Sequence, residues 1–165
     1  MIKDNQLPPV PASDLIFLLF RARQSVYRIQ ERDVSRHGVT LEQATVMELI
    51  HGNRDISIGD ICRIMIREHH TITSLIRRMV KNDLVIVTKG SRGKISLALT
   101  PQGSSILGQM TTEDDSVKLV STLDDVEQRR LAYYLLKVTK NALKEFGKLE
   151  EYNIPGGFAG NIPEE

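Results

Sequence analysis

The segment His69–Lys81, "HHTITSLIRRMVK", decides the fold, because its two sides carry opposite kinds of residue. Four apolar residues recur at the i, i+3, i+4, i+7 spacing of a buried helix face: Ile72, Leu75, Ile76 and Met79. The other side carries hydrogen-bonding groups and no carboxylate: His70, Thr73, Ser74, Arg77 and Arg78. We predict a helix that packs one face on a core and offers the other to an external partner.

Two shorter helices are predicted before this segment. Thr40 and Gln43 have the spacing of a capping box, which opens a helix that closes at His51–Asn53. Ser57 and Asp60 repeat the same spacing and open the next helix. A tight turn then leads into the helix that begins near His69.

The chain changes from helical to strand periodicity after Asn82–Asp83. The stretch "LVIV" (84–87) is rich in β-branched residues, and "KISLALT" (94–100) alternates from one face to the other. Its two faces carry Ile95, Leu97 and Leu99 against Lys94, Ser96 and Ala98. The basic segment "TKGSRG" (88–93) lies between the strands and predicts a hairpin loop. The order helix, turn, helix, hairpin is that of a winged helix-turn-helix.

Long helices are predicted on both sides of this unit. Ser13 or Asp14 is expected to cap the first, which should end near His37–Gly38. Its apolar stripe is Leu15, Leu18, Leu19, Ala22, Val26 and Ile29. Another helix should start at Thr100–Pro101, with Ile106, Leu107, Met110, Val117 and Val120 on its apolar side. Thr122 and Asp125 are expected to cap the last one, whose stripe is Leu131, Leu135, Val138, Ala142 and Phe146.

Length and composition favour an ordinary globular protein. The 165 residues suffice for one well-cored domain or two small lobes, and 41% are hydrophobic and 26% charged. No apolar run is long enough to span a membrane, and the N-terminus lacks the pattern of a secretory signal. The single cysteine, Cys62, permits no internal disulfide, so a cytoplasmic location fits best.

Positive charge is concentrated in the middle of the chain. The net charge is only +1, yet Arg63–Lys94 contains eight basic residues and two acids, Glu68 and Asp83. A basic centre in a nearly neutral protein is typical of phosphate binding, although runs of charge are usually solvated surfaces.

These elements together resemble the multiple antibiotic resistance regulator (MarR) family of bacterial transcription factors. The resemblance is carried by "TLEQATVMELI", "SIGDICRIM", "TITSLIRRMVKNDLV", the wing and "LALTPQG", and it covers Ser13–Gly147. It implies a mainly helical fold with a β-hairpin wing, divided into an N-terminal arm and dimerisation helix (1–37), a DNA-binding lobe (38–100), C-terminal dimerisation helices (101–150) and a loose tail (151–165).

The resemblance also implies partners. It predicts a homodimer that binds double-stranded DNA at a pseudo-palindromic operator and acts as a repressor released by a small lipophilic ligand or a chemical signal. The wing departs from the family pattern, because the positions of the usual aspartate and arginine hold Ser91 and Gly93.

We predict that the DNA-binding residues lie at the helix starts, on the exposed side of the His69–Lys81 helix and on the wing. They are Ser57, His69, His70, Thr71, Thr73, Ser74, Arg77, Arg78, Lys81, Lys89, Arg92 and Lys94. Arginine can bind guanine with two hydrogen bonds, and hydroxyl groups bind bases or phosphates. The alternatives are a solvated helix face, an ordinary basic loop and, for Ser57, simple helix capping.

Other chemistry is less well supported by the residues. Cys62 lies on an inward stripe and has no second cysteine to resolve an oxidised thiol, so burial is the favoured interpretation. His37, His51 and Glu68–His70 do not have the spacing of a metal site, and we expect no metal or cofactor.

The remaining alternatives concern ligands and function. Tyr27, Tyr133 and Tyr134 are candidates for lining an effector pocket or for packing. No catalytic constellation is present, so we expect no enzyme. The alternative to a DNA-binding regulator is a winged-helix protein-interaction module.

Overall fold

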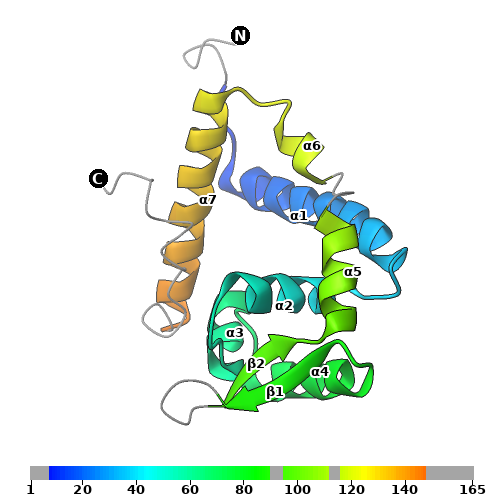
Figure 1. Cartoon of the computed structure of the whole chain (residues 1–165). Helices are drawn as coiled ribbons and strands as arrows, with labels where there is room; N and C mark the ends of the chain where they lie inside the picture. Colours follow the sequence, from blue (N-terminus) through cyan, green and yellow to red (C-terminus); the bar gives the residue numbers. More distant parts are fainter. Residues whose placement is uncertain (1–7, 90–94, 112–115, 148–165) are drawn as a thin grey trace.

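The computed structural model describes residues 8–89, 95–111 and 116–147, which form helices and one β-hairpin (Figure 1). The helices are α1 (Ala12–Ser35), α2 (Leu41–Gly52), α3 (Ile58–Met65), α4 (His69–Lys81), α5 (Pro101–Thr111), α6 (Ser116–Val120) and α7 (Asp125–Glu145). The strands are β1 (Val85–Lys89) and β2 (Ile95–Leu99). The predicted mainly helical fold with a winged helix-turn-helix is confirmed.

One hydrophobic core holds α2, α3, α4 and the base of the hairpin together. Its fully buried side chains come from each of these elements: Val46, Met47, Ile61, Ile72, Met79 and Val85. The stripe predicted for α4 faces this core, with Ile72, Leu75, Ile76 and Met79 all buried. Packing of that stripe therefore fixes which side of α4 faces outward.

Capping boxes open α2 and α3 where the sequence predicts them. The Thr40 hydroxyl accepts a hydrogen bond from the Gln43 N–H at 3.3 Å, and the Gln43 side chain accepts one from the Thr40 N–H at 2.9 Å. Ser57 and Asp60 form the same pair of bonds at the start of α3. Gly38, predicted as the stop after the first helix, has φ +74°, a conformation that L-residues avoid.

The two long helices begin differently from the prediction. α1 begins at Ala12 after Pro11 and has no side-chain cap, so neither Ser13 nor Asp14 caps it. α7 is capped by Asp124, whose carboxylate accepts hydrogen bonds from two backbone N–H groups, rather than by Thr122 with Asp125. A carboxylate satisfies two of the free N–H groups of a helix start, whereas the Thr122 hydroxyl donates to the Leu119 carbonyl.

The hairpin is antiparallel, with Val85 opposite Leu99 and Val87 opposite Leu97. The Leu97 N–H donates to the Ile56 carbonyl at 3.0 Å, so β2 lies between β1 and the segment that leads into the cap of α3. The burial of the β2 side chains does not follow the predicted alternation of apolar and polar residues. Ile95 is 65% exposed and Ser96 is 2% exposed, because the outer half of the strand extends past the core while the Ser96 hydroxyl bonds that of Thr88.

A compact joint connects α5 to the lobe formed by α2–α4 and the hairpin, which we call the recognition lobe. The Thr100 N–H donates to the Leu84 carbonyl at 3.1 Å, and its hydroxyl donates to the Asp83 carbonyl. The same hydroxyl accepts the Gly103 N–H at 2.9 Å and caps α5. Asp83 has φ +54°, which turns the chain sharply from α4 into β1.

We predicted a single helix from Thr100–Pro101, whereas the structure has two helices in this region, α5 and α6. Residues 112–115 between them lie outside the described residues. In Figure 1, α1 lies above the lobe of α2–α4 and the hairpin, and α7 runs down the left side until its C-terminal end is level with α2 and α3. α5 runs from the hairpin up to α1.

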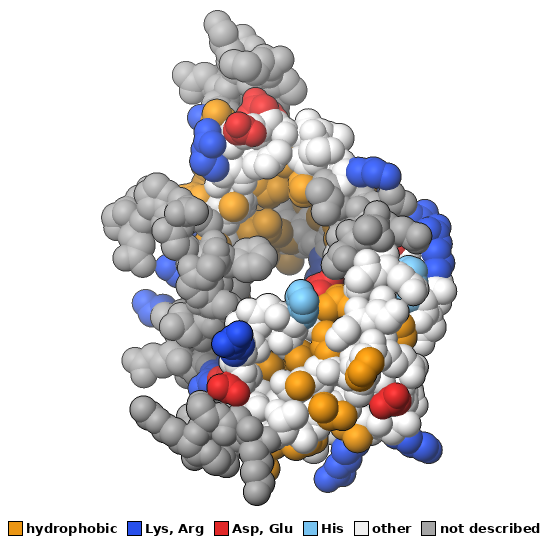
Figure 2. All heavy atoms as spheres, viewed as in Figure 1, with side chains coloured by type: hydrophobic (Ala, Val, Ile, Leu, Met, Phe, Trp, Pro, Cys, Tyr) orange, Lys and Arg blue, Asp and Glu red, His pale blue; other side chains and the backbone are white. Residues whose placement is uncertain are grey.

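The stripes of α1 and α7 are largely uncovered in the single chain. Leu15 and Leu18 on α1 are 50% and 56% exposed, and Leu131 and Val138 on α7 are 41% and 45% exposed. Figure 2 shows hydrophobic side chains gathered over the N-terminal half of α1, on the side of α7. None of the described helices is long and apolar enough to cross a membrane.

Candidate nucleic-acid interface

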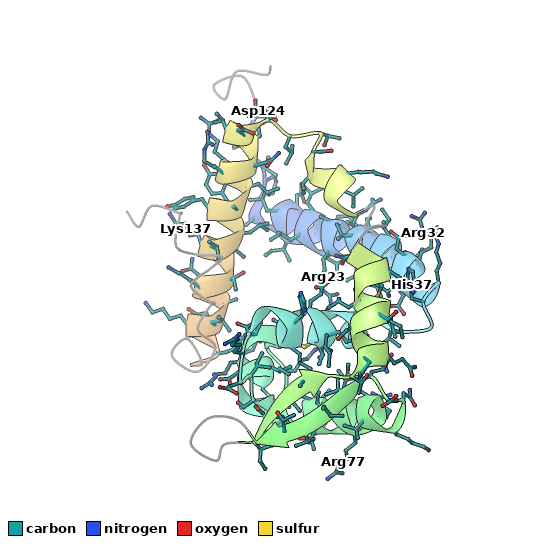
Figure 3. The ribbon with its side chains drawn as sticks, in the orientation of Figure 1. Arg23, Arg32, His37, Arg77, Asp124 and Lys137 are labelled. Atoms are coloured by element: carbon teal, nitrogen blue, oxygen red, sulfur yellow. The ribbon has the colours of Figure 1, made fainter. Side chains whose placement is uncertain are left out.

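The outward face of α4 carries most of the predicted site residues. His69, His70, Thr71, Ser74, Arg77, Arg78 and Lys81 are exposed, and Thr73 is half-buried. Figure 3 shows Arg77 projecting from the lower edge of the molecule, away from the other elements. The structure thus brings the predicted helix residues together on one surface, which the described part of the chain leaves open.

The N-terminal turn of α4 is suited to meeting negative charge. It contains no acidic residue, and no side chain caps its first N–H groups. Free N–H groups and the helix dipole make such a turn locally positive. The His69 Nδ1 lies 3.2 Å from the Thr73 hydroxyl, so these two side chains are held together one turn apart.

The turn between α3 and α4 sets the angle at which α4 leaves α3. Ile66 ends α3 with φ +52°, in the left-handed region. The Arg67 N–H donates to the Cys62 carbonyl at 3.0 Å and closes the turn. This position usually favours glycine, because a β-branched side chain is strained there. The residue type at this position, isoleucine, does not indicate such a conformation, so it was not predicted.

Ser57 is occupied by capping in this structure. Its N–H donates to the Asp60 carboxylate at 2.9 Å, and its hydroxyl also contacts that carboxylate at 2.6 Å. The Ser57 hydroxyl bond is the main cause of the lowered pKa of Asp60, to which the bond from Arg63 contributes. A phosphate could receive the Ser57 N–H only if Asp60 released it.

Fewer of the predicted site residues on the wing than on α4 fall within the described part of the chain. Lys89 ends β1, but its side chain lies outside what can be described, and Arg92 and Lys94 fall outside the described residues. Ser91 and Gly93, which stand where the family has its aspartate and arginine, fall there as well. The predicted basic tip therefore stays a prediction.

The structure also places the residues that were considered for thiol oxidation, metal binding and an effector pocket. Cys62 is 8% exposed, and burial raises the pKa of its thiol. Among the described residues, no three His, Cys, Asp or Glu side chains are arranged to hold a metal. Tyr133 and Tyr134 stack edge to face on α7 with ring centroids 5.4 Å apart, whereas Tyr27 lies on α1.

One connection between α1 and the lobe was missed from the sequence. The Glu31 carboxylate accepts the Leu41 N–H at 3.0 Å, at the start of α2. Glu42 and Glu31 raise the pKa of Tyr27, because their negative charges oppose ionisation of the phenol. The Arg23 guanidinium lies over the Tyr27 ring, 6.0 Å from its centroid. Glu31 and Leu41 are ten positions apart, so no local spacing could have indicated their contact.

The described residues define a winged helix-turn-helix with long flanking helices, the architecture of a class of DNA-binding regulators. Comparison with solved structures shows that the fold is that of the MarR-family transcriptional regulators. No protein-family model and no curated protein sequence matches the chain.

Three solved structures illustrate the similarity. The MepR–DNA complex of S. aureus is 18% identical, with 76% of this chain and 94% of that chain covered and a TM-score of 0.70. A mutant of E. coli MarR complexed with operator DNA is 22% identical, with 76% and 93% covered and a TM-score of 0.68. S. aureus MarR in complex with salicylate and kanamycin is 14% identical, with 81% and 93% covered and a TM-score of 0.68.

Proposed function

We propose that this protein is a homodimeric, sequence-specific DNA-binding transcriptional regulator of the bacterial cytoplasm. The observation that carries the proposal is the outward face of α4, where exposed hydroxyl, imidazole and guanidinium groups occur without a carboxylate. Such a face suits the major groove, because base edges and phosphates offer mainly acceptors to these donors. The fold is that of a regulator family whose members are not enzymes.

The residues of this interface are proposed to have different roles. Arg77 is proposed to read a base edge, together with His70, Thr73 and Ser74 nearer the start of α4. Arg78 and Lys81 at its C-terminal end, and Lys89, Arg92 and Lys94 on the wing, are proposed to contact phosphates. His69 and Thr71 position the first turn, and Ser57 acts mainly through its cap on α3.

The exposed apolar faces of α1 and α7 support dimerisation. Phe17 and Phe20 are 58% and 61% exposed on α1, and Leu135 is 43% exposed on α7. Exposed apolar faces of this size are typical of protein–protein interfaces. We assign residues 1–37 and 101–150 to dimerisation and 38–100 to DNA, with half-sites about 10 base pairs apart along a pseudo-palindromic operator.

Release from DNA is proposed to follow a change in the separation of the two lobes. A small lipophilic effector that binds one dimer geometry better than the other would shift the population toward it. The complex of S. aureus MarR with salicylate supports this class of ligand. A regulator released in this way acts as a repressor.

The test starts by selecting duplexes from a randomised pool with the purified protein at near-physiological salt. We expect a two-fold symmetric site to emerge. Arg77→Ala should then weaken binding to that site by roughly 1–3 kcal/mol while leaving mixed-sequence DNA less affected. Arg129→Ala is the matched control, because it removes the same charge from an exposed position on α7.

Two outcomes would contradict the proposal. If no duplex is enriched and the protein ignores DNA even at low salt, α4 does not serve DNA, and docking of an acidic protein becomes the better function. If Arg77→Ala and Arg129→Ala weaken binding equally, the α4 face is not the reading surface. Equal weakening by Arg77→Ala on all sequences would assign that side chain to phosphate.

A further inference from the structure

Two side chains on the outward face of α4 are bonded to each other one helical turn apart. The Nδ1 atom of His69 lies 3.2 Å from the hydroxyl oxygen of Thr73. His69 is exposed and Thr73 is half-buried. Arg77 continues the same row a further turn along the helix, and it projects away from the other elements (Figure 3). We call His69 and Thr73 the imidazole–hydroxyl pair.

The direction of the bond within this pair depends on the protons of the imidazole. A neutral imidazole with its proton on Nε2 only accepts at Nδ1, so the Thr73 hydroxyl donates to it and offers lone pairs outward. A charged imidazole donates from Nδ1, and the Thr73 hydroxyl is then free to donate its own proton to another group. The second neutral tautomer also donates from Nδ1, so only the charged form fixes the direction. Histidine is the side chain whose charge ordinarily changes between about pH 5 and about pH 8.

Charges of both signs lie on the elements around the imidazole–hydroxyl pair. α3 and β1 pack against α4, and a tight turn precedes it. The charged residues of these elements, of the turn and of the same row on α4 are Asp60, Arg63, Arg67, Glu68, Arg77 and Lys89. Asp60 and Arg63 form an ion pair with each other, whereas Glu68 directly precedes His69. A duplex adds a dense row of phosphates to this balance, and negative charge favours the charged form of an imidazole.

We propose that DNA binding takes up a proton at His69 and that the Thr73 hydroxyl then donates to an acceptor on a base edge. This rests on the proposed function, because a duplex must be seated on α4. The acceptors of the major groove are N7 of adenine and guanine, O6 of guanine and O4 of thymine. The neutral pair with its proton on Nε2 would instead offer an acceptor, which suits the amino groups of adenine and cytosine. The pair thus makes the base preference at one position of each half-site depend on pH.

The sign of the effect on affinity follows from the proton uptake. Because the complex holds more protons than the free protein, affinity rises as pH falls. The rise is confined to the pH range in which the imidazole of the free protein is neutral. It levels off at lower pH, where the free protein is charged as well and binding takes up no further proton.

The experiment measures binding of the selected duplex by fluorescence anisotropy at constant ionic strength, from about pH 8 to about pH 5.5. His69→Gln is the test variant, because glutamine forms hydrogen bonds but takes up no proton. His70→Gln and His51→Gln are the controls, since they remove exposed histidines beside the pair and on α2. Thr73→Val keeps the shape of the side chain and removes the hydroxyl. Calorimetry in two buffers with different ionisation enthalpies counts the protons taken up, and duplexes changed at single base pairs report the base preference.

We expect the wild-type affinity to rise about tenfold between about pH 8 and about pH 6, with the same rise for both controls. His69→Gln should show neither the rise nor a change of base preference with pH. Thr73→Val should still take up a proton on binding, but its base preference should be the same at every pH.

Three results would overturn the inference. They are a flat pH profile of the wild type, a rise that His69→Gln retains, and a rise that His70→Gln abolishes. A base preference that changes with pH in Thr73→Val as in the wild type would remove Thr73 from the reading of the base. If the wild type binds no duplex at any pH, the proposed function fails first and this inference with it, whereas binding with a flat pH profile refutes this inference alone.

Discussion

Replacing Gly103 by alanine should destabilise the protein, because a Cβ at this position has no space. An ideal Cβ would lie 2.2 Å from the Leu84 carbonyl oxygen and 3.1 Å from its carbonyl carbon. Ordinary contact begins at 3.4 Å, so the two must separate by about 1.2 Å (3.4 − 2.2). The obstacle is backbone in a buried joint, which cannot rotate away as a side chain would.

The expected cost combines three effects. Overpacking a buried position costs about 1–3 kcal/mol. Moving the Leu84 carbonyl also weakens the hydrogen bond that it accepts from the Thr100 N–H at 3.1 Å, which costs about 1 kcal/mol. The higher helix propensity of alanine returns up to about 1 kcal/mol. The free energy of unfolding should therefore fall by about 2 kcal/mol for Gly103→Ala.

Gly108 provides a matched control in the same helix, because nothing lies within 4 Å of its ideal Cβ. Gly108→Ala should raise the free energy of unfolding by up to about 1 kcal/mol. In thermal denaturation at one protein concentration, Gly103→Ala should lower Tm by about 4–8 °C and Gly108→Ala should raise it by a few degrees. If Gly103→Ala is as stable as Gly108→Ala, the close approach of α5 to Leu84 is not a constraint in solution.

Three further predictions concern single groups. Ile66→Gly should raise the free energy of unfolding by about 1 kcal/mol, because glycine adopts the left-handed conformation at the end of α3 without steric strain. An unchanged urea midpoint would argue against strain at Ile66. Asp60 has a lowered pKa, so its stabilising effect is complete above the ordinary carboxyl range and is lost as pH falls through the lowered value. The urea midpoint of the wild type should therefore drop more from about pH 7 to about pH 3 than that of Asp60→Asn, and equal drops would contradict this role. Glu42→Gln should lower the pKa of Tyr27, because Glu42 is the largest cause of its rise, and an unchanged NMR titration of the tyrosine ring would remove that cause.

Much of the recognition lobe could be predicted because its signals are local. The capping boxes at Thr40 and Ser57 depend on residues three positions apart, and the α4 stripe depends on spacings of three and four. Such contacts lie within one or two helical turns, so the sequence contains all the information that they need. The same locality explains why the outward face of α4 was predicted residue by residue.

Features that depend on long-range packing could not be predicted in this way. Alternation placed Ile95 and Leu97 on one face but could not say where the core ends, so their opposite burial required the fold. The close approach of Gly103 to Leu84 joins residues nineteen positions apart, and no periodic pattern records it. The cap of α7 was misplaced because Thr122 and Asp124 are both good capping residues, and only the helix start decides between them.

Besides the packing of Leu107 and Met110 of α5 into the core, two sets of hydrogen bonds to backbone groups connect the recognition lobe to the flanking helices. At one end, Thr100 bonds the carbonyls of Asp83 and Leu84 at the turn that ends α4. At the other end, Glu31 on α1 binds the N–H of Leu41 at the start of α2. A shift of α1 or α5 must therefore carry the lobe with it, since the core between these two sets of bonds is close-packed and deforms little. If the flanking helices dimerise as proposed, regulation by spacing of whole lobes is mechanically easier than regulation by reshaping α4.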